Sequence, residues 1–522
     1  MRAICPFLHP KPIGRLLLLL ASAIALPEWE LQAEVKMPAI FSDNMVLQQE
    51  IAMPVWGKAD PGEKVIVTVA GQTVSTSADE NGKWRVKLPP MKADGKPLTL
   101  TVSAKNKIVI NNVLLGEVWL GSGQSNMQMS VMNVANAQAE MAAATYPQIR
   151  TFAVKRRGWP QPLEDVEGVW LISSPETINR FSAVLYFFGR DLHQQIHQPI
   201  GLINSSYGGT IIQSWMRWDV LMSDPETKTQ AEARVKELDD SQWVEKKFTE
   251  DTTKYTRAVE KAKAENKPLQ MAKPSKVGPE EKSRPGGLYN GMIHPLLGYG
   301  MRGILWYQGE YNVGQAEQYA RLFPKMIADW RQQWGLGELP FFFVQLPPIS
   351  KPQDTPMLPS SQTAWAALRE AQSRSLSVPN TAMAVTIDTA ADGDLHPKDK
   401  QPVGNRLALL AAHQVYRKET ASFSPMYRSH SREGTVMRLN FARAEGGLLT
   451  KDGGSARGFA VAGADRNFVW AEAKIEGEQV IVSSPGIMEP VAVRYGWANH
   501  PVISVFNKKG LPLAPFRTDD WE

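Results

Sequence analysis

A serine in a short turn and a distant histidine are the two residues of this sequence best suited to act together. Ser125 lies in the segment 121–127 (GSGQSNM), directly after an apolar run that ends at Leu120. A serine hydroxyl is a poor nucleophile without a base. A turn at a strand end can expose that hydroxyl beside backbone N–H groups able to stabilise an oxyanion. Because Met127 replaces the last glycine of Gly-x-Ser-x-Gly, an α/β-hydrolase nucleophile elbow is disfavoured, and the turn alone favours a structural serine.

His396 is the candidate base. It follows Asp392 and Asp394 and precedes Pro397, which favours the start of a helix. A carboxylate near an imidazole can fix its tautomer and stabilise the imidazolium. The alternatives are a turn with a solvated histidine, or a metal site. Since no dense second group of metal ligands stands elsewhere in the sequence, we predict no metal.

Two further loops carry groups that could face an oxyanion. The segment 204–210 (NSSYGGT) contains Gly208 and Gly209, whose lack of a Cβ lets a backbone N–H approach a substrate oxygen. The segment 307–312 (YQGEYN) supplies the amides of Gln308 and Asn312. Either loop alone is a weak signal, because a Gly-Gly pair is more often a simple turn.

The motifs, taken in order, resemble the bacterial sialate O-acetylesterase family, which belongs to the SGNH hydrolases. The likeness covers nearly the whole chain after its first thirty-odd residues. The segments that carry it are 41–48 (FSDNMVLQ), 54–57 (PVWG), 116–119 (GEVW), 123–127 (GQSNM), 205–210 (SSYGGT), 306–310 (WYQGE), 365–372 (WAALREAQ), 394–397 (DLHP) and 515–521 (PFRTDDW).

The resemblance implies an α/β protein: an SGNH-hydrolase, flavodoxin-like three-layer α/β/α catalytic domain with flanking β-sandwich domains. It implies that Ser125 attacks an acetyl ester and that His396 takes its proton, with no cofactor. It also implies an oxyanion hole shared by the N–H of Ser125, by Gly208 or Gly209, and by Gln308 or Asn312. The remaining polar residues of these motifs, together with a histidine in the segment 289–295 (YNGMIHP), are expected to contact the sugar: Gln124, Tyr207, Glu310 and His294.

The sequence departs from the family pattern at several site positions. Gln128 stands where the family usually has Glu, Tyr207 where it often has Trp, and Tyr311 where Ser is usual. Gly393 occupies the aspartate place of the common Asp-x-x-His spacing. We favour Asp394 as the third member of the triad, with Asp392 or a backbone carbonyl as alternatives.

These residues must be positioned by a parallel α/β sheet. Apolar runs followed by small or polar residues predict strands at 113–120, 200–204, 304–307, 341–345 and 383–387. The carboxyl ends of parallel strands gather a site, so the loops after them should converge. We predict a catalytic domain in two parts, 111–220 and 284–429, interrupted by a Lys/Glu-rich helical insertion at 221–283 that is either a solvated spacer or a lid. β-rich segments flank it, a sandwich-like domain at 34–110 and a C-terminal domain at 430–522.

The first 33 residues have the pattern of a secretory signal peptide: a basic start, an apolar run at 16–26 and a small residue, Ala33, at a plausible cleavage point. We therefore expect an exported protein, periplasmic or extracellular. The single cysteine, Cys5, precedes the apolar run, so the mature chain would have no thiol. No other apolar stretch is long enough to span a bilayer.

The composition is that of a globular protein, with 43% hydrophobic and 21% charged residues. The formal charge of +5 comes without a dense basic run, so we predict no nucleic-acid partner. The expected partner is a small O-acetylated sugar or glycan. Rival hypotheses are an acetylxylan esterase or other sugar O-deacetylase, a non-catalytic carbohydrate-binding protein, and a lipase.

Overall fold

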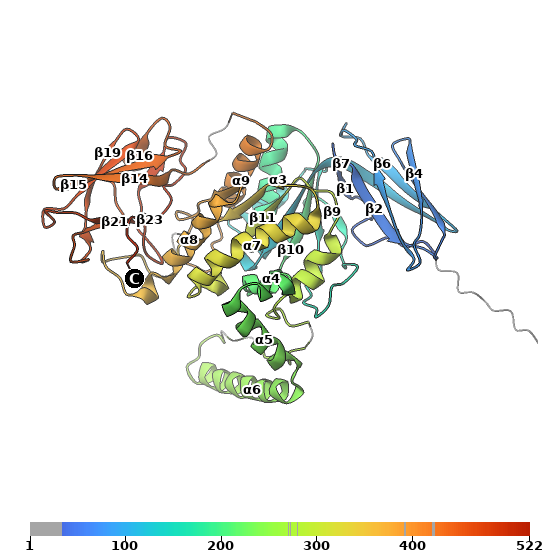
Figure 1. Cartoon of the computed structure of the whole chain (residues 1–522), viewed down its shortest axis with the longest axis horizontal. Helices are drawn as coiled ribbons and strands as arrows, with labels where there is room; N and C mark the ends of the chain where they lie inside the picture. The colour runs from blue at the N-terminus through green and yellow to red at the C-terminus, as the bar shows by residue number, and fades with distance from the viewer. Residues whose placement is uncertain are drawn as a thin grey trace, which may run out of the picture.

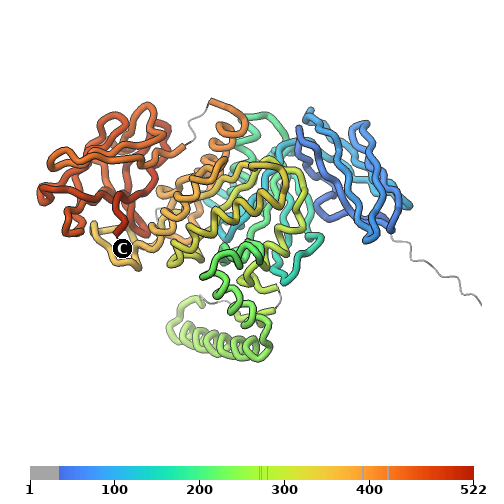
Figure 2. Tube along the Cα trace, in the orientation of Figure 1, coloured from blue at the N-terminus to red at the C-terminus, as the bar shows by residue number. Residues whose placement is uncertain are grey.

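The chain forms three regions in a row, with a helical pair projecting to one side (Figure 1). A computed structural model describes residues 34–269, 271, 273–278, 280–390, 393–419 and 423–521. The predicted signal peptide and Asp392 lie outside the described residues. A β-rich region and a second β-rich region lie at opposite ends of the long axis, and an α/β region lies between them (Figure 2).

The central region is built on a mixed sheet in which the site-bearing strands run parallel. The order along its main path is β13-β12-β11-β7-β10-β8-β9. Without β8 and β9 this is β10-β7-β11-β12-β13, which in chain order is the 2-1-3-4-5 arrangement of flavodoxin-like folds. The strands are β7 (Lys107–Gly123), β8 (Ile149–Ala153), β9 (Trp170–Ile172), β10 (Ile200–Ser206), β11 (Gly303–Tyr307), β12 (Phe341–Val344) and β13 (Thr381–Ala384). Only β9, at the edge, pairs antiparallel along this path.

Helices cover both faces of this sheet. On one face, Phe188 of α3 (Ala183–Ile196) packs edge-on against Trp119 of β7, with ring centroids 5.1 Å apart. On the other face, Trp306 of β11 packs against Trp330 of α7 (Ala316–Trp334) at 5.8 Å. Helix α9 (Gln401–Gln414) packs beside α3, and α8 (Ala364–Arg374) beside α7. Near-continuous apolar strands are expected where a parallel sheet is covered on both faces, and every residue of β11 and β12 is buried.

Strand β7 belongs to two regions at once. Its first part pairs antiparallel with β6 (Leu98–Ser103) of the N-terminal region, whereas its last part pairs parallel with β10 and β11. The boundary that we predicted at 110/111 therefore falls inside one continuous strand. The exposure pattern changes along it, from alternating in the first residues to fully buried near the end. This change is the physical difference between a one-sided and a two-sided sheet.

The strands of the flanking regions pair antiparallel with one another, while the first strand, Val46–Gln48, pairs parallel with β7. In the N-terminal region, alternate residues such as Trp84, Val86 and Leu88 of β5 are buried. Its remaining strands are β1 (Val46–Gln48), β2 (Met53–Lys58), β3 (Lys64–Val69), β4 (Gln72–Ser77) and β5 (Lys83–Leu88). The C-terminal strands are β14 (Met426–Glu433), β15 (Val436–Ala442), β16 (Leu448–Thr450), β17 (Phe459–Ala462), β18 (Val469–Trp470), β19 (Glu472–Glu476), β20 (Gln479–Ser483), β21 (Ala492–Tyr495), β22 (Val505–Asn507) and β23 (Phe516–Arg517).

Helices α5 (Pro225–Asp239) and α6 (Ser241–Ala264) occupy the Lys/Glu-rich segment and project away from the sheet (Figure 1). Asp224 caps α5 by accepting from the Thr227 N–H, and Asp240 caps α6 in the same way. Only Val244 of α6 is buried, which explains the sparse apolar residues there. Within the described part of the chain, no helix combines the length and apolar character needed to cross a bilayer.

Candidate active site

Ser125 stands at the point where β7 ends and a short helix, α1 (Ser125–Gln128), begins. The turn depends on Gly123, whose φ of +130° is a conformation that side chains rarely adopt. A Cβ at this position would also collide with the Tyr307 carbonyl oxygen. The next N–H, that of Gln124, donates to the same carbonyl at 3.0 Å. The ends of β7 and β11 are thereby joined, and these two strands flank the switch point where an open α/β sheet gathers its site.

His396 meets Ser125 across 271 positions of sequence. Its Nε2 lies 2.8 Å from Ser125 Oγ, and both side chains are only partly buried. Burial lowers the pKa of His396, the positive charge of Lys400 lowers it further, and Asp394 opposes both effects. A lowered pKa keeps the imidazole neutral near pH 7, and the neutral form is the one that can accept a proton from the serine.

The third member of the triad is not established by the contacts. Asp394 Oδ1 accepts a hydrogen bond from the backbone N–H of His396 at 3.0 Å, so this carboxylate stabilises the loop that carries the histidine. Among the described residues no side chain is bonded to the His396 Nδ1 atom. Asp394 therefore acts on the ring through its charge.

A buried polar network lies directly behind the serine–histidine pair. Asn126 donates to Glu310 Oε1 at 2.5 Å and to the Leu395 carbonyl at 3.0 Å, and it accepts from Lys400 Nζ at 2.6 Å. Burial raises the pKa of Glu310 and lowers that of Lys400 to about 8. The network ties the serine turn to the histidine loop, so it fixes the distance between them.

Two residues that we expected to contact the sugar belong to this buried layer instead. Glu310 is bonded to Asn126 and is 8% exposed, and Gln124 is 1% exposed, with its Oε1 accepting from the Gly309 N–H. Gln124 pairs a backbone N–H that would otherwise be left without an acceptor, and Glu310 pairs the Asn126 side chain. Neither residue is among those that line the cavity shared by Ser125 and His396.

The amides of Gln308 and Asn312 are also engaged within the protein. Gln308 Nε2 donates to the Thr210 carbonyl and to Asn312 Oδ1, and Asn312 Nδ2 donates to the Oε1 atoms of Gln213 and Gln315. Both side chains are buried. In this arrangement neither amide faces Ser125, contrary to the expected oxyanion role. They join the loop after β11 to the loop after β10.

The loop with Gly208 and Gly209 does reach the serine. A Cβ placed on Gly208 would lie 3.2 Å from the Cβ of Ser125. The Gly208 N–H donates to Gln128 Oε1 at 2.7 Å, and the Gly208 carbonyl accepts from Lys282 Nζ at 3.1 Å. A Cβ on Gly209 would crowd the same lysine and lie in ordinary contact with the Tyr311 ring. The backbone passes close to Ser125 here because Gly208 and Gly209 carry no side chains.

Ser125 and His396 open into a cavity of about 1050 Å³. Tyr207, expected to contact the sugar, lines it, as do the loop residues Asn204 and Ser206. The cavity also has a basic wall that our sequence reasoning missed, formed by Lys155, Arg156 and Arg180. The available signal was the run of basic residues 155–157 directly after β8, a strand that we did not predict.

His294 lies elsewhere. Its ring is bonded to the Leu163 carbonyl at 2.9 Å and lines a different cavity, shared with Trp56 and Arg85 of the N-terminal region. His294 is not among the residues that line the cavity of Ser125 and His396. The reason is local: a helical turn, Tyr289–Ile293, precedes it and directs the following residues toward the N-terminal β-sheets.

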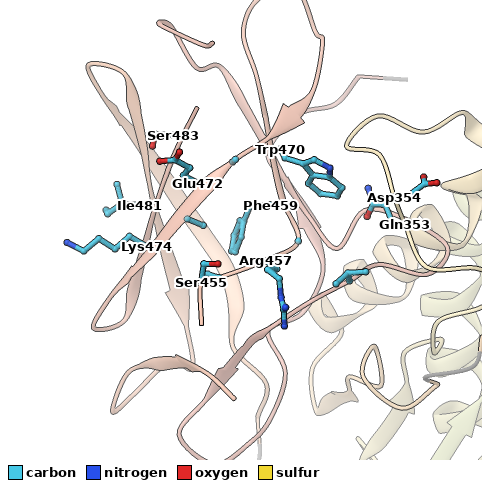
Figure 3. A pocket seen from close by; sticks show the side chains of 15 residues that line it. Gln353, Asp354, Ser455, Arg457, Phe459, Trp470, Glu472, Lys474, Ile481 and Ser483 are labelled. Atoms are coloured by element: carbon cyan, nitrogen blue, oxygen red, sulfur yellow. The ribbon is translucent and has the colours of Figure 1, made fainter. Parts of the chain in front are cut away.

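Another cavity, of about 840 Å³, lies between the C-terminal region and the loop that carries Gln353 and Asp354 (Figure 3). It is lined by serines, charged side chains and the half-exposed Trp470. None of its lining residues is a histidine or cysteine. Within the described ranges, no three or more His, Cys, Asp or Glu side chains are grouped as metal ligands would be.

A serine bonded to a histidine, placed at the carboxyl ends of parallel strands, is the arrangement of a hydrolase that acts by acyl transfer. Comparison with known families agrees with that class. Residues 115–272 and 280–413, more than half of the chain, match the family described as carbohydrate esterase, sialic acid-specific acetylesterase. The chain belongs to this family, and it is an esterase.

Similar proteins extend the match beyond the catalytic region. A sialate O-acetylesterase of Rattus norvegicus is 32% identical over 454 residues, 79% of each chain. That of Homo sapiens is 32% identical over 418 residues, which is 73% of this chain and 71% of the human one. A solved carbohydrate acetylesterase from Xanthomonas citri superposes with a TM-score of 0.79 at 33% identity, covering 94% of this chain and all of that one.

Proposed function

We propose that this esterase removes O-acetyl groups from sialic acid through an acyl-enzyme, with Ser125 as nucleophile and His396 as general base. The observation that carries the proposal is the 2.8 Å contact between His396 Nε2 and Ser125 Oγ. Both atoms belong to residues that line an open cavity, so an ester can reach them. A hydrogen-bonded nucleophile and base is the geometry that acyl transfer requires.

In the first half-reaction, Ser125 Oγ attacks the acetyl carbonyl carbon while its proton passes to His396 Nε2. The tetrahedral intermediate collapses as the bond from carbon to the sugar oxygen breaks, and the leaving oxygen takes the proton from His396. In the second half-reaction, water attacks the acetyl-serine, gives a proton to His396 and releases acetate. The proton then returns to Ser125 Oγ. His396 is thus base and then acid in each half.

The oxyanion needs donors, and the backbone offers them. The N–H of Ser125 is at the first position of α1, where no intrahelical acceptor is available. The Gly208 N–H adjoins Ser125 and is bonded to Gln128 Oε1. We assign the oxyanion to these two N–H groups, with Gln128 releasing Gly208 as the substrate carbonyl arrives. Asp394 holds the histidine loop and favours the imidazolium through its charge.

The choice of sialic acid rests on the relatives, which are named sialate O-acetylesterases. The alternative is another acetylated sugar, since the relative of known structure is named only a carbohydrate acetylesterase. Comparing acetate release from O-acetylated sialic acid and from acetylated xylan separates the two. We further propose that residues 1–33 direct export; detection of the mature chain in a periplasmic fraction, starting after Ala33, would test this.

The mechanism is tested by Ser125→Ala. We expect hydrolysis of p-nitrophenyl acetate to fall by at least about 10⁴-fold, because removing the nucleophile of a serine hydrolase leaves only residual catalysis. Labelling by a fluorophosphonate should also disappear, while the melting curve stays close to that of the unmodified protein.

Ser130→Ala is the matched control. Ser130 lines the same cavity, but its hydroxyl accepts from Asn133 and is not bonded to a histidine. This variant should keep its activity and its labelling. Equal losses in the two variants, or full activity in Ser125→Ala, would refute the assignment.

A further inference from the structure

One wall of the active-site cavity is formed by basic residues. Lys155, Arg156 and Arg180 line the cavity together with Ser125 and His396, and none of its lining residues is Asp or Glu. Lys155 is paired with Glu167 at 2.7 Å. Arg156 and Arg180 are exposed and form no ion pair with any carboxylate that the structure describes. Two guanidinium groups are therefore available to a ligand beside the nucleophile.

Arg156 is placed by the sheet. Strand β8 ends at Ala153, and the next N–H, of Val154, still donates to the Asn204 carbonyl at the end of β10. Arg156 consequently emerges at the same sheet edge as the loop after β10. Its guanidinium carbon lies 5.7 Å from the centre of the Tyr207 ring, which also lines the cavity.

Arg180 is placed by the serine turn itself. It ends a short 3₁₀ helix, Ile178–Arg180, two residues before Ser182. Ser182 Oγ donates to the Met127 carbonyl at 2.6 Å, and the Phe181 carbonyl accepts from the Val131 N–H at 3.0 Å. These bonds hold the segment of Arg180 against the residues that directly follow the nucleophile.

A third cation adds to the positive charge beside Ser125. Lys282, at the end of the helical insertion, donates to the Gly208 carbonyl and lies 5.7 Å from the Tyr207 ring. It has no carboxylate partner among the described residues. The insertion thus contributes one positive charge next to the nucleophile, although its helices project away from the sheet.

We propose that Arg156 and Arg180 bind the carboxylate of an acetylated sugar acid and so select it over neutral acetylated sugars. Guanidinium groups match carboxylates in planar, charge-assisted pairs. Sialic acid carries a carboxylate on its ring, whereas the xylan backbone is neutral, so this wall distinguishes the two substrates by charge. The inference rests on the proposed function and adds to it the residues that recognise the acid.

The experiment compares three substrates: O-acetylated N-acetylneuraminic acid, its neutral methyl ester, and p-nitrophenyl acetate. Arg156→Gln and Arg180→Gln should each raise KM for the acid by about 10- to 100-fold, which is the loss expected for a charge-assisted hydrogen bond. The KM for the methyl ester, and turnover of p-nitrophenyl acetate, should stay within about twofold. Free N-acetylneuraminic acid, used as a competitor of p-nitrophenyl acetate, should lose potency by the same factor.

Arg156→Lys and Arg180→Lys keep the charge but not the planar fork, so they should recover part of the affinity for the acid. Arg432→Gln, on the exposed strand β14 of the C-terminal region, is the matched control and should leave all kinetic values unchanged.

Unmodified protein that hydrolyses acid and methyl ester with equal kcat/KM would overturn this inference. So would equal losses on all three substrates in the arginine variants. The proposed mechanism would still stand in both cases, because it is judged by Ser125→Ala on p-nitrophenyl acetate.

Discussion

Two cavities in the described part of the chain are of comparable size, but they differ in whether a serine and a histidine meet there. The catalytic cavity measures about 1050 Å³, and the C-terminal one about 840 Å³. Both are lined by serines and by charged side chains. What differs is the backbone beneath them. The first lies at the carboxyl ends of parallel strands, whereas the second lies between antiparallel strands of the C-terminal region and the loop of Gln353 and Asp354.

The difference shows that the residue types of a cavity do not define its chemistry. Ser455 and Ser483 line the C-terminal cavity near Glu472 and Lys474, yet no imidazole lines it. Ser125 meets an imidazole because a turn that needs Gly123 ends its strand and a loop from far along the chain brings His396 to 2.8 Å, which is why we propose Ser125 as the nucleophile. Three changes test that contrast, and the first two are each matched by a control substitution in the C-terminal region.

The largest effect is expected from Gly123→Ala. The positive φ and the clash with the Tyr307 carbonyl should cost about 1–3 kcal/mol of stability. Displacement of Ser125 should lower kcat on the order of 10²-fold, since a shift of about 1 Å is enough for that loss. The measurements are thermal melting and p-nitrophenyl acetate turnover. Gly486→Ala, in the C-terminal region with open space where a Cβ would lie, should change neither the melting temperature nor the turnover. If Gly123→Ala also changed neither, the turn at Gly123 would not be needed to place Ser125.

An intermediate effect is expected from Lys400→Met, seen in the pH profile. Lys400, with a pKa of about 8, is charged throughout the acid range and lowers the pKa of His396. Removing that charge should raise the pKa of His396. Because the base must be neutral, the acid limb of kcat/KM should move to higher pH. Lys474→Met, which alters the other cavity, should leave the limb in place. If the acid limb of kcat/KM does not move in Lys400→Met, or moves to lower pH, then Lys400 does not lower the pKa of His396.

The smallest effect is expected from Trp470→Ala. Trp470 is 40% exposed and lines the C-terminal cavity, away from the parallel strand ends. Removing its ring should change kcat/KM for p-nitrophenyl acetate by less than about twofold, with a melting shift within the range of ordinary surface substitutions. A loss of turnover without unfolding would mean that the two cavities are coupled.

The sequence predicted correctly those structural features that depend on a single strand or a single turn. The parallel strands follow from apolar runs separated by helical stretches, and the structure contains each of those strands. The flavodoxin-like fold was implied by the family resemblance, and the strand order agrees with it. The pairing of Ser125 with His396 also followed, since strand ends converge in such sheets.

What the sequence did not disclose is the direction of polar side chains within a loop. Gln308 and Glu310 stand in the same loop as the predicted site, but both point inward to satisfy neighbouring polar groups. That direction depends on which loops pack together, and a single sequence does not contain this information. Arg180 was missed because its segment is brought to Ser125 by bonds between distant segments, from Ser182 to Met127 and from Val131 to Phe181.

Strand β7 starts among the N-terminal strands and ends at Gly123, directly before Gln124. This continuity limits where the chain can be divided. Cutting the chain near residue 110 would leave half of a ladder unpaired and expose the hydrogen-bonding groups that β6 now covers. The N-terminal region is therefore not an interchangeable module. Replacing it, in evolution or by engineering, would require rebuilding the strand that leads to Ser125.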